Sequence, residues 1–196
     1  MKKHIVIIVT LFCFIACKNK TASVDDTKSN NEASSYKLGD LPNKNTDYDT
    51  LIGNNDTSKI SEDVNNLIAI LKKDKFTVKT NKQLQTPLNL YLYEENRIII
   101  LKDVSTFKLF ARSIISDKRM KNTFPDFTLY EMNFKNDHDA EMVLKWFEEA
   151  RRQRVTEKID VDKIFSKTNK VYYLTTRAEM FRNYIDMYSY FIKTNP

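Results

Sequence analysis

From Lys59 to Pro196 the chain contains no cysteine and no glycine, yet it holds 19 aromatic residues. Without cysteine, this part of the chain can form neither a disulfide nor a thiolate metal site. The two glycines of the sequence, Gly39 and Gly53, both precede it, so loops that cradle phosphate with glycine are excluded there. Its length is typical of one domain. We therefore expect residues 59–196 to form a single domain with an aromatic-rich core.

The spacing of apolar residues predicts the elements of the first half of this domain. Helical intervals predict a helix over 61–73, and a short alternating run predicts a strand over 76–80. Two β-rich runs, 88–93 and 97–101, flank a polar turn and predict a hairpin. We expect a second helix to begin near Ser105, because apolar residues follow that serine at helical intervals. These residues are Phe107, Phe110, Ala111, Ile114 and Ile115.

The second half of the domain also alternates between segments with strand-like and with helical spacing of apolar residues. The polar residues before the long helical pattern are good helix caps. The expected elements are, in order, a strand over 127–134, a helix that begins at Asn136 or Asp137, a hairpin of 164–165 with 171–175, and a helix over 178–192.

Two segments of the domain, 96–101 and 169–174, match in character, and each leads into an expected helix. One interpretation is a pair of helix-hairpin-helix pseudo-repeats. The other is an α+β two-layer sandwich without internal repetition, which requires only the order of the elements. Both interpretations place the protein in the α+β class, with a mainly antiparallel sheet and helices packed on one face.

The first residues have the organisation of a secretory leader. Lys2 and Lys3 precede an apolar run from Ile5 to Ala16. A helix needs about 20 apolar residues to span a bilayer, so this run is too short to remain in one. A short apolar run behind positive charges is typical of a signal peptide, and we assign residues 1–16 to it.

The run ends in Phe14-Ile15-Ala16-Cys17, which resembles the lipobox of bacterial lipoproteins, although that family prefers leucine where Phe14 stands. The resemblance implies that Cys17 receives a diacylglycerol, becomes the first residue of the mature chain and anchors it in a membrane. Lasting residence in a bilayer takes more than one acyl chain, and a modified Cys17 meets this need. Lys18 stands where an inner-membrane retention signal carries aspartate, which favours the outer membrane. The alternative is an ordinary cleaved signal peptide.

Between the leader and the domain the chain is strongly polar. Of the 41 residues from 18 to 58, 23 are Ser, Thr, Asn or Asp, and the apolar residues follow no period. Such a segment buries too little surface to offset the entropy lost on ordering. We therefore expect residues 17–58 to be an acylated N-terminus followed by a disordered tether, which as a flexible coil would span roughly 35 Å.

The sequence offers few groups for catalysis. His138 is the one histidine of the expected mature chain, and it stands between acidic residues at the start of a predicted helix, where acids are favoured. A metal site of Asp137, His138 and Asp139 is the alternative, but adjacent residues in one turn point apart. Asp160 and Asp162 could serve as an acid and base pair or bind Mg²⁺ or Ca²⁺, but the further oxygens and the glycine of a calcium loop are absent, so we interpret them as residues of a solvated loop. We therefore assign no catalytic residue, no metal and no cofactor.

A cluster of lysines lies near the first predicted helix. Export from the cytosol argues against nucleic acid as its partner and leaves lipid headgroups, lipopolysaccharide and acidic proteins as the available polyanions. A weak contact with an anionic surface is one hypothesis for this cluster, and an ordinary solvated face is the other. The cluster consists of Lys72, Lys73, Lys75, Lys79 and Lys82.

Two aromatic residues, Trp146 and Tyr190, fall at the edge or outside of the apolar stripes of their helices. Exposed aromatic side chains are typical of partner-binding surfaces. The leading hypothesis is therefore a membrane-anchored cell-envelope lipoprotein whose soluble domain binds a protein partner, as an accessory subunit or an immunity-type module does. A glycan- or lipid-binding lipoprotein is one alternative. A hydrolase that attacks envelope material with carboxylates alone is another.

Overall fold

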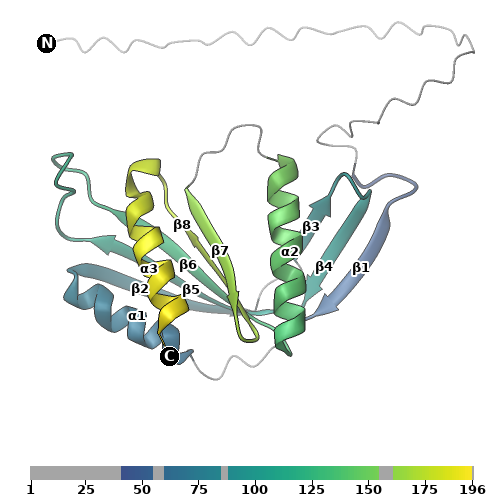
Figure 1. Ribbon diagram of the computed structural model, residues 1–196, viewed down its shortest axis with the longest axis horizontal. Coiled ribbons are helices and arrows are strands. Elements are labelled where there is room, and N and C mark those ends of the chain that lie inside the picture. The colour runs from purple at the N-terminus through teal and green to yellow at the C-terminus, as the bar shows by residue number, and fades with distance from the viewer. Residues whose placement is uncertain (1–40, 55–59, 85–87, 155–160, 196) are drawn as a thin grey trace, which may run out of the picture. The chain divides into compact units, whose positions relative to one another are not determined.

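The computed structural model describes residues 41–54, 60–84, 88–154 and 161–195, all within the unit Ser35–Pro196. These residues form strands and helices, which confirms the α+β class, but the strands make two sheets instead of the expected single one. The elements are β1 (Asp47–Ile52), α1 (Glu62–Lys73), β2 (Phe76–Leu84), β3 (Leu88–Leu92), β4 (Arg97–Lys102), β5 (Ser105–Ser113), β6 (Asp126–Asn133), α2 (Asp137–Arg154), β7 (Asp162–Lys167), β8 (Lys170–Thr175), the 3-10 helix η1 (Glu179–Phe181) and α3 (Arg182–Thr194) (Figure 1).

The larger sheet has the strand order β2-β5-β6-β8-β7, and every neighbouring pair in it is antiparallel. One face of this sheet forms an apolar core with α1 and α3, which contact each other on that face (Figure 1). Aromatic rings fill much of this core: Phe76 and Phe127 both pack on the ring of Tyr188, with centroid distances of 5.8 and 5.2 Å. Buried rings contribute large apolar areas, so the aromatic composition serves the core, as expected.

Helix α1 forms where the spacing predicts it. Ser61 caps its first turn, since its Oγ accepts a hydrogen bond from the N–H of Val64 at 3.2 Å. Acidic residues occupy the first turn and two lysines the last, as the helix dipole favours. The side chains of Leu67 and Leu71 are fully buried, so the predicted apolar stripe is the one that packs on the sheet.

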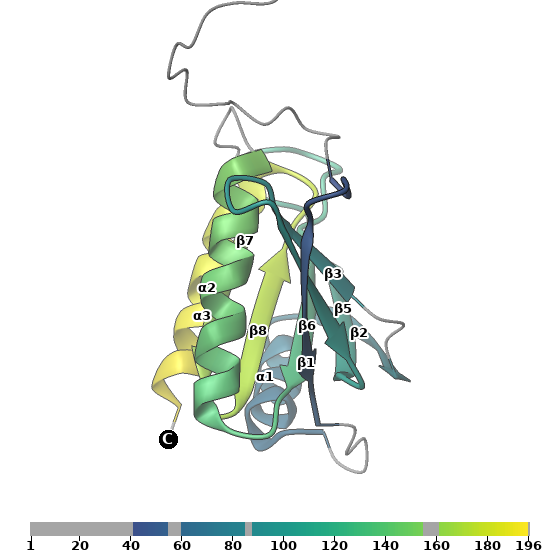
Figure 2. The ribbon, with the colours of Figure 1, turned by 90° about the vertical axis from the view of Figure 1, so that its right-hand side faces the viewer.

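The smaller sheet has the order β1-β4-β3 and combines a parallel pair, β1–β4, with the antiparallel hairpin β3–β4. Helix α2 packs against β3 and also against β7 and β8 (Figure 2). A second apolar core lies among α2, the smaller sheet and parts of β6 and β8. Alternate residues of β8 belong to the two cores, Tyr172 and Leu174 to the first and Val171 to the second. The hairpin β7–β8 therefore separates the two cores, and the helices pack on both sides of it instead of on one face as expected.

The predicted helix near Ser105 is wrong, because residues 105–113 form β5, an inner strand of the larger sheet. Its apolar residues fit a helical spacing, but Phe107, Leu109 and Ala111 also alternate, and all three are buried in the first core. Ladders with β2 on one side and β6 on the other decide the conformation. With a strand in this position, the helix-hairpin-helix pseudo-repeats are not supported.

Residues 47–52, which were expected to belong to the disordered tether, form β1. The strand pairs with β4 along all six residues, although only its Leu51 side chain is buried. Gly53 then donates its N–H to the carbonyl of Lys102 at 2.8 Å, and a Cβ at this glycine would lie 2.7 Å from the Val104 side chain. Gly53 is therefore part of the fold and is required by a close approach. The rest of the expected tether, together with the leader and Cys17, lies outside the described residues.

The remaining predicted elements are confirmed with shifted ends. The two hairpins are β3–β4 and β7–β8, and the predicted strands become β2 and β6. Helix α2 begins after Asn136, whose Oδ1 accepts the N–H of Asp139 at 2.8 Å. The last helix, α3, begins at Arg182 and not at residue 178, because the short helix η1 precedes it.

Candidate functional site

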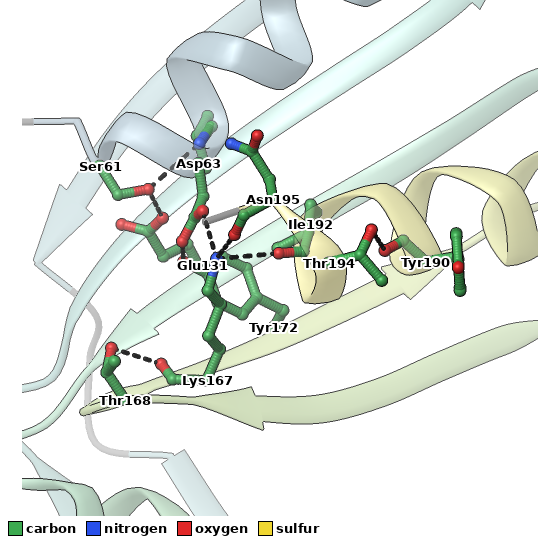
Figure 3. A network of polar contacts seen from close by, with 11 residues as sticks. Ser61, Asp63, Glu131, Lys167, Thr168, Tyr172, Tyr190, Ile192, Thr194 and Asn195 are labelled. Carbon is green, nitrogen blue, oxygen red and sulfur yellow. Dashed lines mark hydrogen bonds and ion pairs between the residues drawn. The ribbon is translucent and has the colours of Figure 1, made fainter.

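A cluster of polar side chains lies between the start of α1, the end of α3 and the larger sheet (Figure 3). The Nζ of Lys167, on β7, is 2.7 Å from Oδ1 of Asp63. The same ammonium donates to the carbonyl oxygens of Ile192 and Asn195 at 3.0 and 2.6 Å. Tyr172 donates its hydroxyl to Oδ2 of Asp63 at 3.0 Å. One ammonium group therefore joins the start of α1 to the end of α3.

Glu131 is the most buried carboxyl of this cluster and accepts a hydrogen bond from the hydroxyl of Ser61. Burial raises the pKa of Glu131, and the hydrogen bond from Ser61 offsets this only in part. Burial, with the nearby charges of Glu131 and Asp63, also raises the pKa of the Tyr172 hydroxyl. Neither of the two hollows described below is lined by these residues. We therefore interpret the cluster as a structural network.

A hollow of about 300 Å³ opens where α2 meets β3 and the hairpin β7–β8. Strands β3 and β7 are each the last strand of their sheet, so the outer strands of both sheets contribute to its wall. Most of the lining side chains are apolar, and the volume suits one large side chain or a small ligand. The lining residues are Leu88, Asn89, Leu90, Phe147, Ala150, Arg151, Asp162, Ile164 and Tyr173.

The charged groups of this hollow form an ion pair. Nη2 of Arg151 is 2.7 Å from Oδ1 of Asp162. The pKa of the Tyr173 hydroxyl is raised, first by burial and then by the charge of Asp162. The interpretation of Asp162 as a residue of a solvated loop is therefore wrong, because it begins β7 and its side chain is largely buried, whereas Asp160 lies outside the described residues. Among the described lining residues the hollow holds one carboxylate, whereas hydrolysis of the glycosidase type uses two.

Tyr173 links the hollow to a strip of side chains on the face of the larger sheet that turns away from α1 and α3. The strand register places Tyr130 of β6 opposite Tyr173, and Lys108 of β5 opposite Tyr130. The two tyrosine rings stack at 6.1 Å, and Nζ of Lys108 lies 5.4 Å from the centroid of Tyr130, within cation–π range. Residues directly opposite each other share a face, so the strip is continuous. We name the hollow together with this strip the Tyr173 site.

The same face of the sheet carries further cations. Lys79 and Arg112 are exposed on it, and a second hollow, of about 310 Å³, lies around Phe110 and Arg177. Nε of Arg177 is 3.0 Å from Oδ2 of Asp126. Burial nevertheless raises the pKa of Asp126, because it outweighs the opposing effect of the arginine. This face therefore combines positive charge with aromatic side chains.

The structure places the two aromatic residues predicted for partner binding on different helices, and neither lines the Tyr173 site. Tyr190 of α3 is 69% exposed and stands three residues after Met187, which is also exposed. Trp146 of α2 is half-buried and packs on the second core, with the guanidinium of Arg97 5.9 Å from its ring. The structure therefore does not unite them in one site.

The predicted lysine cluster is divided between two elements and the turn that joins them. Lys72 and Lys73 end α1, and Lys75 follows in the turn with a positive φ of 64°. Lys79 lies on the cationic face of the larger sheet, opposite Phe110. The side chain of Lys82 lies outside the part of the chain whose side chains are described.

No family model, curated protein or solved structure matches this chain. Within the described residues, no helix is both long and apolar enough to cross a bilayer. The same residues contain no group of three His, Cys, Asp or Glu side chains placed to hold a metal ion, and His138 is exposed at the start of α2. Function is therefore inferred from the geometry of the molecule itself.

Lys108 and Tyr130 were not predicted as members of a candidate site. The alternation of residues 127–134 contains a partial signal, because Tyr130 falls between the buried Leu129 and Glu131 and therefore faces the other side of the strand. The side of the sheet that Lys108 faces could not be predicted, because its segment was expected to be a helix and not a strand. Only the register of β5, β6 and β8 brings these side chains to Tyr173.

Proposed function

We propose that this chain is a cell-envelope lipoprotein, held in the outer membrane by lipidated Cys17, whose domain binds a protein partner at the Tyr173 site. The observation that supports binding is the junction, at Tyr173, of an apolar hollow with a cationic and aromatic strip. Protein interfaces gain affinity from an apolar anchor in a pocket and specificity from the polar groups around it. A location outside the cytosol argues against nucleic acid as the partner.

The geometry indicates the chemistry of the partner segment. A side chain of the size of leucine or phenylalanine fits a hollow of about 300 Å³ among Leu90, Phe147 and Ile164. Residues that flank this anchor would lie along the strip, next to Lys108 and, further across the face, Lys79. Complementary charge orients partners and speeds their association. We therefore propose a segment that combines one buried apolar anchor with acidic neighbours.

A glycan-binding function receives less support from the same strip. Sugars stack on a free face of an aromatic ring, but the ring of Tyr130 already has two close neighbours. Nζ of Lys108 lies 5.4 Å from its centroid, and the ring of Tyr173 stacks with it at 6.1 Å. A carboxylate hydrolase also receives less support, because the described lining of the hollow contributes one carboxylate and Arg151 neutralises it.

Photocrosslinking in membranes tests the proposal. A photoreactive amino acid replaces Asn89, which is exposed at the hollow, in the chain with its native leader and Cys17. In the matched control it replaces Lys145, an exposed residue of α2 that does not line the hollow. We expect a discrete protein adduct from position 89 that is absent from position 145. Lys108→Glu should remove this adduct, whereas Lys145→Glu, the same change of charge, should leave it.

Two results would refute binding at the Tyr173 site. One is the same adduct from both positions, and the other is an adduct from position 89 that survives Lys108→Glu in a correctly folded chain. The anchor is tested separately with Cys17→Ser, which should release the folded domain from membranes. A variant that stays bound through salt and carbonate washes would contradict the proposed lipid anchor.

A further inference from the structure

The loop between β5 and β6 exposes three large apolar side chains within seven residues. Ile114, Ile115 and Met120 are 60%, 57% and 48% exposed. A single exposed apolar residue is ordinary, whereas a local group of them indicates an interaction surface. We name residues 114–125 the β5–β6 loop, and it follows β5 at the left-hand end of the larger sheet in Figure 1.

Hydrogen bonds hold the β5–β6 loop in this shape. The N–H of Asp117 donates to the carbonyl of Thr123 at 2.7 Å, and the carbonyl of Asp117 accepts from the N–H of Met120 at 3.2 Å. The buried carboxylate of Asp117 accepts from the backbone N–H and the Nε of Arg119 at 2.8 and 3.0 Å, which lowers its pKa to about 2. Arg119 also donates to the carbonyl of Met180 at 2.5 Å. A fixed loop, tied to the start of the last helical segment, therefore presents the apolar side chains.

Cations surround these apolar side chains. Lys118, Arg119 and Lys121 are exposed within the β5–β6 loop itself. Lys75, in the turn after α1, is joined to the loop because its carbonyl accepts the N–H of Ile114 at 2.9 Å. The positive charge of the loop and that of the turn therefore lie at the same end of the sheet.

The end of α1 adds to this positive charge. Lys72 and Lys73, two of the lysines predicted to contact an anionic surface, occupy its last turn, and Figure 1 shows that turn at the same end as the β5–β6 loop. The same segments carry two acids: Asp74, which accepts the neutral hydroxyl of Tyr188 at 3.0 Å, and Asp117, which is paired with Arg119. The six cations of the loop, the turn and the end of α1 outnumber them. The surface around the exposed isoleucines is therefore strongly positive.

From this arrangement we infer that the β5–β6 loop docks on an anionic lipid bilayer. Ile114, Ile115 and Met120 enter the interface between headgroups and acyl chains, while Lys118 and Lys121 contact the headgroup phosphates. Peripheral membrane binding combines these two contributions, apolar insertion and attraction of cations to anionic lipid. Neither hollow described above is lined by residues of this loop, so the surface suits a fluid lipid layer better than a shaped protein partner.

This inference goes beyond partner binding at the Tyr173 site and does not depend on it. The anchor proposed at Cys17 lies 24 residues before Leu41, the first described residue. A chain of this length spans at most roughly 80 Å when fully extended. The anchor therefore leaves the domain free to turn the β5–β6 loop towards the same bilayer, and docking would give the tethered domain a preferred orientation.

A fluorophore attached at one chosen position tests the inference. The sequence after Cys17 contains no other cysteine, so a cysteine introduced into the domain is labelled at that position alone. The acylated chain carries Ile115→Cys labelled with an environment-sensitive nitrobenzoxadiazole group and is reconstituted into vesicles of phosphatidylcholine and phosphatidylglycerol in equal parts. Met120→Cys gives a second reading from the same loop, and Lys145→Cys, on α2, is the matched control. Intact mass spectrometry of the same preparation reports the acylation of Cys17 separately.

We expect the label at positions 115 and 120 to brighten, shift to the blue and be quenched by lipids with spin labels in their acyl chains, and the label at 145 to stay aqueous. Adding Lys118→Glu and Lys121→Glu should lower the ratio of docked to free domain at least about tenfold, because each positive charge lost near an anionic surface lowers this ratio about fivefold. A label that stays aqueous at 115 and 120, or responds equally in vesicles of phosphatidylcholine alone, would overturn the inference. A response that appears only when envelope proteins are present would assign the loop to a protein partner and would likewise overturn it.

Discussion

Replacing Lys167 by methionine tests whether the polar network holds the first core together. Methionine is close to lysine in length and fills irregular space well, so the substitution removes the charge with little change in packing. The ammonium of Lys167 is bound to Asp63 at 2.7 Å and to two carbonyl oxygens at the end of α3. The variant therefore loses one ion pair and two further hydrogen bonds at a single point.

The burial of the pair sets the size of the effect. The side chains of Lys167 and Asp63 are 23% and 16% exposed, so solvent reaches both in part. Breaking a fully buried pair costs about 3–5 kcal/mol, since one charge is left uncompensated. Asp63 keeps the hydrogen bond from Tyr172, but the carbonyls at the end of α3 lose their donor. We expect the free energy of unfolding to fall by about 2–4 kcal/mol, out of a typical total of roughly 5–15 kcal/mol.

Urea unfolding of the mature chain with Cys17→Ser measures this loss. The fluorescence of Trp146, in the second core, and far-ultraviolet circular dichroism should give coincident transitions. Lys163→Met is the matched control on the same strand, because the pair of Lys163 with Asp186 is 35% and 43% exposed and contributes at most about 1 kcal/mol. Equal losses for the two variants, or a loss below about 0.5 kcal/mol for Lys167→Met, would refute the structural role of the network.

Three further predictions follow from burial and charge. Leu109→Ala should lower the free energy of unfolding by about 2–5 kcal/mol, because this side chain of β5 is fully buried. Ile115→Ser should change it by less than about 0.5 kcal/mol, because Ile115 is exposed. Urea unfolding that shows the reverse order would contradict the assignment of residues 105–113 to a buried strand. The pKa of Glu131 is raised in the folded state. Its contribution to folding stability is therefore fully present below the pKa of the unfolded state and is lost as pH rises through the pKa of the folded state. Glu131→Gln should therefore gain stability relative to the native chain as pH rises above about 4.5, the usual pKa of a glutamate, and a difference independent of pH would count against this prediction. The pKa of Asp117 is lowered from 3.8 to about 2, so its contribution to folding stability is lost as pH falls through that range. In an acid titration followed by circular dichroism, Asp117→Asn should lack this part of the unfolding transition. An unchanged transition would contradict the prediction.

Local signals predict the elements whose conformation is fixed locally. Ser61 caps α1, and Asn136 caps α2, because a side chain that satisfies an unpaired N–H is visible in the sequence. The hairpin turns are also local, since Asn96 and Thr168 adopt positive φ within short polar stretches. Helices and hairpins of this kind require no knowledge of distant residues, which is why the α+β class could be predicted.

The features that were not predicted depend on distant pairing. β5 has apolar residues that fit either a helix or a strand, and its two neighbours in the sheet decide between them. β1 buries little more than Leu51 and is stabilised by its pairing with β4, so its polar composition resembles a tether. The candidate site has the same origin, because Lys108, Tyr130 and Tyr173 come together only through the order β5-β6-β8.

The dissociation constant of the protein captured at position 89 tests the central claim most directly. It is measured with purified partner for the native chain, for Lys108→Glu and for the control Lys145→Glu. Binding at the Tyr173 site predicts that Lys108→Glu weakens affinity at least about tenfold, that added salt narrows the difference, and that Lys145→Glu matches the native chain. Equal dissociation constants for all three chains would contradict the proposal that this cationic, aromatic face binds the partner.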